Sequence, residues 1–464
     1  MEKWLIILLY IIHFATAGET NQNSSNICTR CKCNSKDEFL LDCTNQNFEH
    51  ILAEWPPHNQ SLVATFSYNN ITNLGQLPAT NQTAKFVFDH CRIKHLEDRM
   101  FFLIQNVEYI DLSHNLLTTE AISGEVFKGP YSDRQYRPIG VKTLNLAYNQ
   151  IHSLNTKFFE HMPLLEDLYL QGNDFSVLDP STQIALGSLT NIKVLNLADN
   201  ELTVIEENVM RNVHSLQDLD LSSNHFDFVP KPLSYISKNL QILNLSNNYI
   251  FQLTDESFLG MNLSELYLNN LPRLKFVGPN TFATLRRLKK LHLRDNQQLE
   301  FIDREAFGET QILDELDISN NSLVDLDPSL TKWSKLKIFK VNLNPLECSC
   351  SLYNISQALP TSITRNRNSP MCIDVGNDDG SERIYSLTAD ICNQDRQSHS
   401  SKITQHFNKI RLIMIILSSI LLVVTVLGAV VAVLRFRKLI AFKNYPFSAQ
   451  VSYFPVQTTQ TQHI

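Results

Sequence analysis

Apolar residues and asparagine recur at regular spacing through the middle of this chain, and this repeat limits its fold more than any other feature. The frame is L-x-x-L-x-L-x-x-N-x-L, with other apolar residues at some leucine positions. Nine clear copies begin at residues 107, 141, 165, 192, 216, 240, 288, 313 and 336, and weaker ones lie at 64–71, 86–93 and 263–271. The asparagine positions are 69, 91, 115, 149, 173, 200, 224, 248, 271, 296, 321 and 344, spaced 22 to 27 residues apart except for one gap of 34. Twelve units at such spacing predict a solenoid.

The repeat also predicts a role for each residue type. One unit is too small to bury its own apolar face, so neighbouring units stack and share a core. The L-x-L segment is a short strand with its leucines turned inward, and asparagine satisfies backbone groups of the buried turn that follows. Cys91 occupies one asparagine position, where we expect a structural free thiol; a reactive or intermolecular cysteine is the alternative. A spine of apolar residues is expected six positions before the frames, at Phe101, Phe159, Leu186, Met210, Phe282, Phe307 and Leu330.

The other eight cysteines form two clusters around this cysteine-poor body. Cys28, Cys31, Cys33 and Cys43 precede it, and Cys348, Cys350, Cys372 and Cys392 follow it. In an oxidising compartment these clusters predict two disulfide-stapled caps, each with three possible pairings. A zinc site is the rival interpretation of the first cluster, but no matching ligand pair lies nearby.

Repeats and cysteine clusters together resemble the extracellular leucine-rich repeat family, over about residues 28–392. The resemblance implies an α/β solenoid, a curved horseshoe of about 12 units with a parallel concave β-sheet. It also implies the disulfides Cys28–Cys33, Cys31–Cys43, Cys348–Cys372 and Cys350–Cys392. Leu346 stands where the family commonly has an aromatic residue, which is a mild departure.

Two apolar segments predict a single-pass type I protein of the plasma membrane. Lys3, a short apolar run and Ala15-Thr16-Ala17 indicate a signal peptide. Residues 412–434 carry no charge and are long enough to span a bilayer. The expected organisation is a signal peptide (1–17), an N-terminal cap (18–47), repeats (48–346), a C-terminal cap (347–392), a juxtamembrane stalk (393–411), a transmembrane helix (412–434) and a short cytoplasmic tail (435–464).

With the leucines inward, the residues between them face the concave side of the sheet. The central row is Asp111, Asn145, Tyr169, Asn196, Asp220, Asn244, Tyr267, His292, Asp317 and Lys340. The second row is Tyr109, Thr143, Asp167, Val194, Asp218, Ile242, Glu265, Lys290, Glu315 and Ile338. Our candidate protein-binding residues on this face are Tyr109, Asp111, Asp167, Tyr169, Asp218, Asp220, Glu265, Tyr267, His292, Arg294, Glu315 and Asp317.

The centre of this face combines acidic and aromatic side chains, which suits a protein partner that carries arginine or lysine. Lys290, His292 and Arg294 form a basic step beyond it. Such a surface has the dimensions of a protein-docking site rather than of a small-molecule pocket. For any single residue, an ordinary solvated strand position is the competing interpretation.

Other functional classes are disfavoured. The chain has only 13 glycines and lacks GxGxxG, GxxxxGK[ST], HExxH and GxSxG. Its net charge of −7 is not that of a polyanion binder, so no nucleic-acid partner is expected. The paired carboxylates lack a metal-binding loop or an accompanying base. We therefore expect no enzymatic activity, no small-molecule substrate, no cofactor and no metal site.

Two further surface features stand out. The long unit contains an insertion at about 128–139 whose tyrosines and arginines suit a contact loop or, alternatively, an ordinary variable loop. Glycosylation sequons lie at Asn23, Asn59, Asn70, Asn81, Asn244, Asn262, Asn320 and Asn354, all in the expected outer region. Asn244 is expected on the concave face, where a glycan would block docking locally.

These features lead to three functional hypotheses. The first is a cell-surface protein for adhesion or cell–cell recognition, homophilic or not. The second is a receptor or co-receptor for a secreted ligand, in innate immunity for example, that signals through a partner chain. The third is a regulator that binds another receptor in the same membrane and controls its traffic. The scaffold constrains the binding mode far better than the biological role.

Overall fold

The computed structural model describes residues 27–236, 238–308, 312–365, 369–374, 380–393 and 425–435. The chain divides into one unit up to Ile391 and a second from Cys392 onward. Residues 425–435 of the second unit are helical. The expected signal peptide, residues 412–424 of the expected span and nearly all of the tail lie outside the described residues. Within the described ranges, no helix combines the length and the apolar character needed to cross a membrane.

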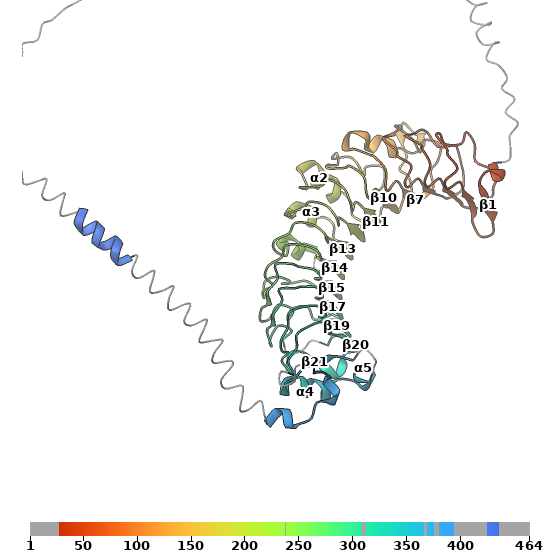
Figure 1. The fold of residues 1–464 in the computed structure, drawn as a ribbon. Helices are drawn as coiled ribbons and strands as arrows, with labels where there is room; N and C mark the ends of the chain where they lie inside the picture. The colour runs from red at the N-terminus through yellow and green to blue at the C-terminus, as the bar shows by residue number, and fades with distance from the viewer. Residues whose placement is uncertain are drawn as a thin grey trace, which may run out of the picture. The chain divides into compact units, whose positions relative to one another are not determined.

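The first unit is a curved solenoid whose inner side is a single sheet (Figure 1). Each of the twelve predicted units contributes one parallel strand to it. These strands are β3 (Leu62–Thr65), β5 (Ala84–Val87), β7 (Val107–Asp111), β10 (Thr143–Asn145), β11 (Asp167–Tyr169), β12 (Val194–Asn196), β13 (Asp218–Asp220), β14 (Ile242–Asn244), β15 (Glu265–Tyr267), β17 (Lys290–His292), β19 (Glu315–Asp317) and β20 (Ile338–Lys340). From β7 to β20 the register is regular, so that Leu144, Leu168 and Leu195 stand side by side.

The convex side carries short and varied elements rather than a helix in every unit. The extended pairs are β4 (Asn73–Leu74) with β6 (His95–Leu96) and β16 (Phe276–Val277) with β18 (Phe301–Ile302). The helical segments include α2 (Pro180–Gly187), α3 (Glu207–Met210), η4 (Lys231–Ile236) and η5 (Trp333–Lys335). Helix α2 lies in a 27-residue unit, which has room for it, and begins with Asp179 accepting a hydrogen bond from Thr182 N at 2.9 Å. Because most units are shorter, the array is a β-solenoid rather than the fully α/β solenoid expected.

A ladder of buried asparagines joins successive units, as predicted. Asn149 is representative: its amide donates to the carbonyls of Leu112, Leu146 and Ala147 at 3.0 to 3.1 Å. Its Oδ1 accepts from Leu117 N at 3.0 Å. Each such side chain therefore satisfies backbone groups of its own turn and of the preceding unit, where water has no access.

The predicted convex spine is also buried. Phe101, Phe282 and Phe307 are almost fully buried, as are the aliphatic residues at the equivalent positions of other units. The rings of Phe282 and Phe307 lie 5.1 Å apart, and that of Phe101 lies 6.1 Å from Phe127. These contacts account for many of the 26 phenylalanines as core residues.

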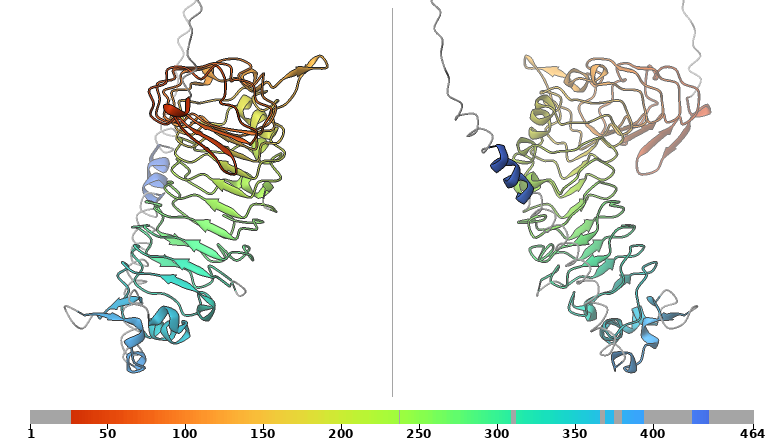
Figure 2. Two further views of the ribbon diagram at one scale, coloured as in Figure 1. Left: turned by 90° about the vertical axis from the view of Figure 1, so that its right-hand side faces the viewer. Right: turned by 60° about the vertical axis from the view of Figure 1, so that its left-hand side comes forward.

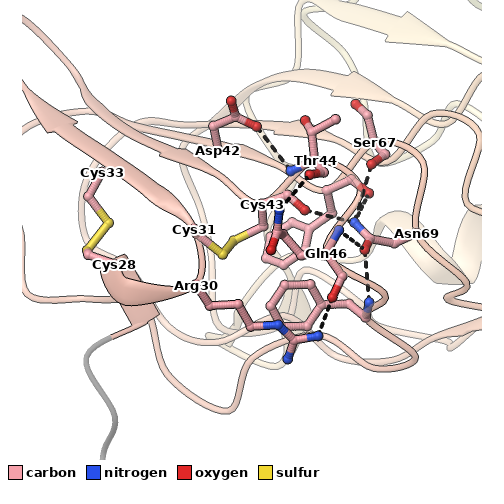
Figure 3. Close-up of a disulfide and its surroundings, with 12 residues drawn as sticks. Cys28, Arg30, Cys31, Cys33, Asp42, Cys43, Thr44, Gln46, Ser67 and Asn69 are labelled. Carbon is pink, nitrogen blue, oxygen red and sulfur yellow. Dashed lines mark hydrogen bonds between the residues drawn. A yellow bond between two sulfur atoms is a disulfide. The ribbon is translucent and has the colours of Figure 1, made fainter.

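The N-terminal end of the core is covered by a disulfide-bonded hairpin. It comprises η1 (Ile27–Thr29), β1 (Lys32–Ser35) and β2 (Phe39–Asp42), and β2 extends the parallel sheet beside β3. The disulfides are Cys28–Cys33 and Cys31–Cys43, the pairs that the family resemblance implies (Figure 3). Asn69 binds the cap to the first unit, because its amide donates to Cys43 O and its Oδ1 accepts from Phe48 N.

The other end is covered by a small helical cap. It comprises α4 (Cys350–Ala358), α5 (Thr361–Thr364), β21 (Met371–Ile373), β22 (Ser381–Arg383) and η6 (Ile384–Ser386). Leu352, Ile355 and Ile384 are buried beneath it. Cys348 is bonded to Cys372, and Cys350 and Cys392 are each in a disulfide. Disulfides near both ends fit passage through the secretory pathway.

The insertion in the long unit forms a hairpin that projects from the solenoid (Figure 2). It follows η2 (Thr119–Ala121) and η3 (Gly124–Phe127) and consists of β8 (Tyr131–Ser132) and β9 (Gln135–Tyr136). The rings of Tyr131 and Tyr136 pack edge to face at 5.0 Å. The lower part of the hairpin is held by Lys128, whose Nζ lies 4.6 Å from the centre of the Tyr136 ring.

Candidate protein-binding face

The two predicted rows are present on the concave side in unbroken register. Asp167 pairs with Val194 and Val194 with Asp218, while Tyr169, Asn196 and Asp220 align in the neighbouring row. In most strands the central leucine is buried and the two flanking residues are partly exposed. The alternation therefore presents both rows to solvent, with neighbouring strands about 4.8 Å apart.

Beside these rows, ion pairs balance the charges at the entry to several strands. Lys142 Nζ lies 3.0 Å from Glu108 Oε1, and Lys193 Nζ lies 2.7 Å from Glu166 Oε2. The hydrogen bond from Lys142 is the main reason that the pKa of Glu108 is lowered. The charges of these paired residues cancel, so the entry to the strands offers little net attraction to a charged partner.

The candidates nearest the N-terminus bind mainly to one another. Tyr109 donates its hydroxyl hydrogen to Asp111 Oδ2 at 3.0 Å, and Asn145 Nδ2 donates to the same oxygen at 3.0 Å. Burial, with the nearby Asp111, raises the pKa of Tyr109. The Asp111 carboxylate is thus already supplied with hydrogen bonds from its neighbours.

The candidates nearest the C-terminus form a closed charge network. Glu265 accepts from Tyr267 and from Lys290, both at 2.7 Å. Lys340 Nζ lies 3.6 Å from Glu315 Oε1 and 3.3 Å from Asp317 Oδ2. The sequence suggested a basic step at Lys290, His292 and Arg294, but Lys290 is neutralised by Glu265 of the adjacent strand, as Lys340 is by Glu315 and Asp317.

His292 lies within this network. Its Nε2 is 3.4 Å from Glu315 Oε1 without forming a hydrogen bond. Burial lowers the pKa of His292, although Glu315 and Asp317 oppose the shift. The imidazole is therefore mainly neutral at physiological pH and adds little positive charge to this end of the face.

Between these two regions lie three carboxylates without a counter-ion, together with one tyrosine. We call this group the central acidic patch: Asp167, Tyr169, Asp218 and Asp220. Among the described residues, the Asp167 carboxylate accepts a hydrogen bond only from Thr143 Oγ1, at 3.0 Å. Asp220 accepts from Ser222 and from Asn244 Nδ2, the latter at 3.1 Å. In the described part of the chain, none of the three carboxylates has an ion-pair partner within 4 Å.

Asp218 is the most exceptional member of this patch. It is half-buried, and no hydrogen bond or ion pair reaches its carboxylate from the described residues. Burial raises the pKa of Asp218, and the charges of Asp220 and Glu265 raise it further. The pKa of Tyr169 is raised by burial and by the charges of Asp167 and Asp218. A partner's cation placed here would relieve an unfavourable concentration of negative charge.

Arg294 lies away from the two rows, just beyond the end of β17. It is exposed and lies 3.5 Å from Asp295. A polar cavity of about 560 Å³ opens beside it, lined mainly by amide side chains that include Asn244, Asn270 and Asn320. Arg294 is thus the one candidate residue that does not lie in a strand, because β17 ends at His292.

The sequons differ in their accessibility. Asn59, Asn70, Asn81 and Asn354 are exposed, whereas Asn244, Asn262 and Asn320 are partly buried. Asn244 lies in the central row as expected and donates to Asp220 Oδ2. Asn320 Nδ2 donates to Asp295 Oδ1 at 2.7 Å. Asn23 lies outside the described residues, and the use of each sequon stays a prediction.

Sequence reasoning did not find an aromatic stack along one edge of the sheet. The rings of Tyr68, His90, His114 and Tyr148 follow one another at 4.2 to 4.4 Å. Each residue stands directly before the asparagine position of its unit and has a positive φ of 53 to 58°. The sequence contains a signal for this stack: every unit has a residue directly before its asparagine position, and in these four successive units that residue is tyrosine or histidine.

A metal site is not apparent in the ranges that the structure covers, where no three His, Cys, Asp or Glu side chains are arranged to hold an ion. The carboxylates of the central acidic patch lie on two strands, β11 and β13, with β12 between them. Together with the open shape of the sheet, this spacing suits an extended protein surface better than a point ligand.

Comparison with known proteins agrees with this architecture. Residues 138–175, 176–226, 238–297 and 286–346 match the model of the leucine rich repeat family. The chain is 27% identical over 256 residues to Tsukushi of Gallus gallus, covering 49% of this chain and 65% of that protein. It is 26% identical over 293 residues to CD180 antigen of Mus musculus, covering 61% of this chain and 39% of that protein.

The chain thus spans less than two thirds of the length of either relative. A solved structure of TLR13 in complex with ssRNA13 is 20% identical, with a TM-score of 0.48, covering 72% of this chain and 54% of that one. The matched family model spans nine of the twelve asparagine positions, from Asn149 to Asn344 and with Leu271 in one of them. Over these matched residues the repeat array is similar to the leucine rich repeat family.

Proposed function

We propose that the protein is a cell-surface recognition molecule that binds an extracellular protein partner through its concave face. The partner presents lysine or arginine to the central acidic patch, and the protein acts in adhesion or cell–cell recognition. Leucine-rich repeat arrays generally act as binding surfaces, and no enzymatic role is proposed for this one. Anchoring by residues 412–434, with the repeats outside the cell, is part of the proposal.

The observation that supports this most directly is the Asp218 carboxylate, half-buried and without a cation. The ion pairs formed elsewhere on the face show that the sheet readily supplies counter-charges from adjacent strands, as for Lys290 and Glu265. A carboxylate left without one in the middle of an exposed sheet has a cost in the free protein. A basic partner that removes this cost gains affinity and specificity from electrostatic complementarity.

The alternatives differ in the partner rather than in the surface. A receptor or co-receptor would bind a soluble ligand and co-purify with a signalling chain. A regulator in the same membrane would alter the surface level of another receptor. Both would use the same acidic patch, so the identity of the partner distinguishes them.

The first experiment is a cell-mixing assay. Non-adhesive cells expressing the full chain are mixed with non-expressing cells, each in its own colour. Self-clustering of the expressing cells would show homophilic adhesion. Without clustering, the expressing cells are probed with a panel of secreted and membrane proteins.

In either format the test variant is Asp167→Asn/Asp218→Asn, which removes two charges with little change in shape. The control is Asp174→Asn/Glu201→Gln, which removes two exposed charges outside the concave rows. We expect the test variant to reduce binding tenfold or more, since hydrogen bonds to charged groups contribute about 1.5 to 3 kcal/mol each. A partner that binds both variants equally well would exclude the central acidic patch as the docking site.

A further inference from the structure

Outside the concave face, a row of exposed apolar side chains runs along the array, three to five residues after the asparagine position of each unit. We call it the lateral row: Val177, Val204, Phe228, Phe276, Phe301 and Val324. They lie in successive units except for one interruption at Gln252. Phe228, Phe276 and Phe301 are 53%, 45% and 56% exposed. Exposed apolar residues are common singly on soluble proteins, but a contiguous row marks an interface.

The middle of the row, from Phe228 to Phe301, is continuous in space. Phe276 and Phe301 are paired in parallel register between β16 and β18. A bridge between Leu253 and Val277 places Gln252 beside Phe276. The ring of Phe251 covers the interruption, because it packs edge to face on Phe228 at 4.7 Å.

A groove of about 790 Å³ lies in the first half of the row. Val204, Phe228 and Pro230 contribute apolar side chains to its wall. Glu206, Asp227 and Glu256 contribute carboxylates, and Lys231 is its basic residue. Apolar side chains surrounded by charges are the usual composition of a protein interface.

The row is not explained by the core of the solenoid. The core position is already occupied by the next residue in the chain, as Leu178 is buried directly after the exposed Val177. The same holds for Val204, Phe228, Phe276 and Phe301. In units outside the row the same position is polar, as at Ser153 before Leu154. None of the sequons falls on a residue of the row.

The order of residue types in the row is nearly symmetric about Gln252. Phe228 and Phe276 lie one unit to either side of it, Val204 and Phe301 two units, and Val177 and Val324 three units, with Val324 one position earlier in its turn because Asp325 directly precedes the buried Leu326. Such a surface matches a second copy of itself turned by a two-fold axis, which brings each residue against its counterpart.

Charge supports the same pairing. Asp227 directly precedes Phe228, and Lys275 directly precedes Phe276. A two-fold axis at Gln252 brings Asp227 of one copy towards Lys275 of the other. In the free protein Asp227 pairs with Arg273 at 2.6 Å, whereas Lys275 is exposed.

We propose that two copies of this chain pair side by side through the lateral row, with Gln252 at the two-fold axis. A fully buried phenylalanine covers roughly 150 to 250 Å². Three that are half-exposed, with the valines and the groove walls, approach the roughly 800 Å² per partner of a standard interface. The pairing leaves the concave face open and does not depend on the proposed function there.

The test uses the full chain expressed in cells with Gln252→Cys. On the proposed axis the two introduced thiols lie side by side, so mild oxidation should give a covalent dimer on a non-reducing gel. Leu259→Cys is the matched control, because it is 58% exposed but lies outside the row. The unaltered chain gives the background, since its Cys91 is buried.

A second arm measures the association itself. Two differently tagged copies are co-expressed and co-precipitated, with and without Phe228→Glu/Phe301→Glu. We expect at least fivefold more cross-linking for Gln252→Cys than for Leu259→Cys, and loss of both cross-linking and co-precipitation when the glutamates are added. Equal cross-linking of the two cysteine variants, or co-precipitation that the glutamates leave unchanged, would overturn the proposal.

Discussion

The Cys91 thiol donates a hydrogen bond to the backbone carbonyl of Phe66, with Sγ and O 2.9 Å apart. In the next unit Asn115 Nδ2 donates to the equivalent carbonyl, Phe88 O, at 2.8 Å. Cysteine therefore replaces the donor of the asparagine ladder. The acceptor is less well replaced, because sulfur accepts hydrogen bonds weakly.

This relationship predicts how the array responds to substitution of Cys91. Cys91→Asn should raise stability by up to about 1 kcal/mol, because it adds a carbonyl acceptor like that of Asn115. Cys91→Ala should lower it by about 1 kcal/mol, since the buried Phe66 carbonyl loses the thiol donor and keeps only the hydrogen bond from Asn69 Nδ2 at 2.7 Å among the described residues. Denaturant unfolding measures both, with Cys91→Ser as the control that keeps a donor. Equal stability of the alanine and asparagine variants would contradict the ladder role.

The same thiol should be unreactive in the folded protein. Burial raises the pKa of Cys91 to about 11, and the charge of Asp89 contributes to the shift. At neutral pH it is therefore protonated as well as shielded. We expect iodoacetamide to modify Cys91 only after unfolding in denaturant, as measured by mass spectrometry of the non-reduced chain. Rapid labelling under native conditions would restore the reactive-cysteine alternative.

The fold was predictable because each unit repeats the same local rule. The twelve frames give twelve strands, and the asparagines and apolar spine lie where their spacing places them. The convex side could not be predicted in the same way. The local structure there depends on the length of the unit: the eight-residue helix α2 forms after the Asp179 cap in a longer unit, whereas shorter units form brief helical segments such as α3 and η4, extended pairs or turns.

The candidate face was predictable in position but not in charge. Alternation shows that Glu265 and Lys290 both face the concave side. It does not show that their side chains meet, because this depends on rotamers and on register between strands. The sequence therefore overestimated the acidic centre and the basic step alike. Among the described residues of this face, carboxylates without an ion-pair partner remain in the central acidic patch and at Asp111, which accepts hydrogen bonds from Tyr109 and Asn145.

Asp218 should make stability depend on pH in a particular direction. Its pKa is raised in the folded protein, so its neutral form is favoured, and its contribution to stability is lost as pH rises through the folded pKa. Asp218→Asn should therefore raise the melting temperature at pH 7. The effect should be below about 1 kcal/mol, because the group is half-exposed, and should vanish near pH 3.

Asp42→Asn provides the control of opposite sign. The hydrogen bonds from Thr44, the backbone one at 3.0 Å, lower the pKa of Asp42. Its ionised form is thus favoured by folding, and this stabilisation is lost as pH falls through the lowered pKa. We expect Asp42→Asn to reduce the melting temperature at pH 7. A destabilising effect of Asp218→Asn at pH 7 would contradict the unfavourable charge that we assign to this site.

The edge stack predicts an energetic coupling between Gly172 and Tyr148. Gly172 has a φ of +67°, and a Cβ built there would meet the Tyr148 ring. Tyr148 in turn stacks on His114 at 4.3 Å. Gly172→Ala should therefore have two costs, one from the left-handed backbone, about 1 kcal/mol, and one from displacement of the ring.

A double-mutant cycle separates these two costs. In a Tyr148→Ala background the ring is gone, so Gly172→Ala should retain only the backbone cost. The two substitutions should be non-additive by about 1 kcal/mol, since residues in direct contact couple. The control pairs Tyr148→Ala with Gly260→Ala, where φ is +78° and no atom lies within 4 Å of the added Cβ. That pair should be additive. Equal coupling in both cycles would show that the Tyr148 ring does not rest on Gly172 in solution.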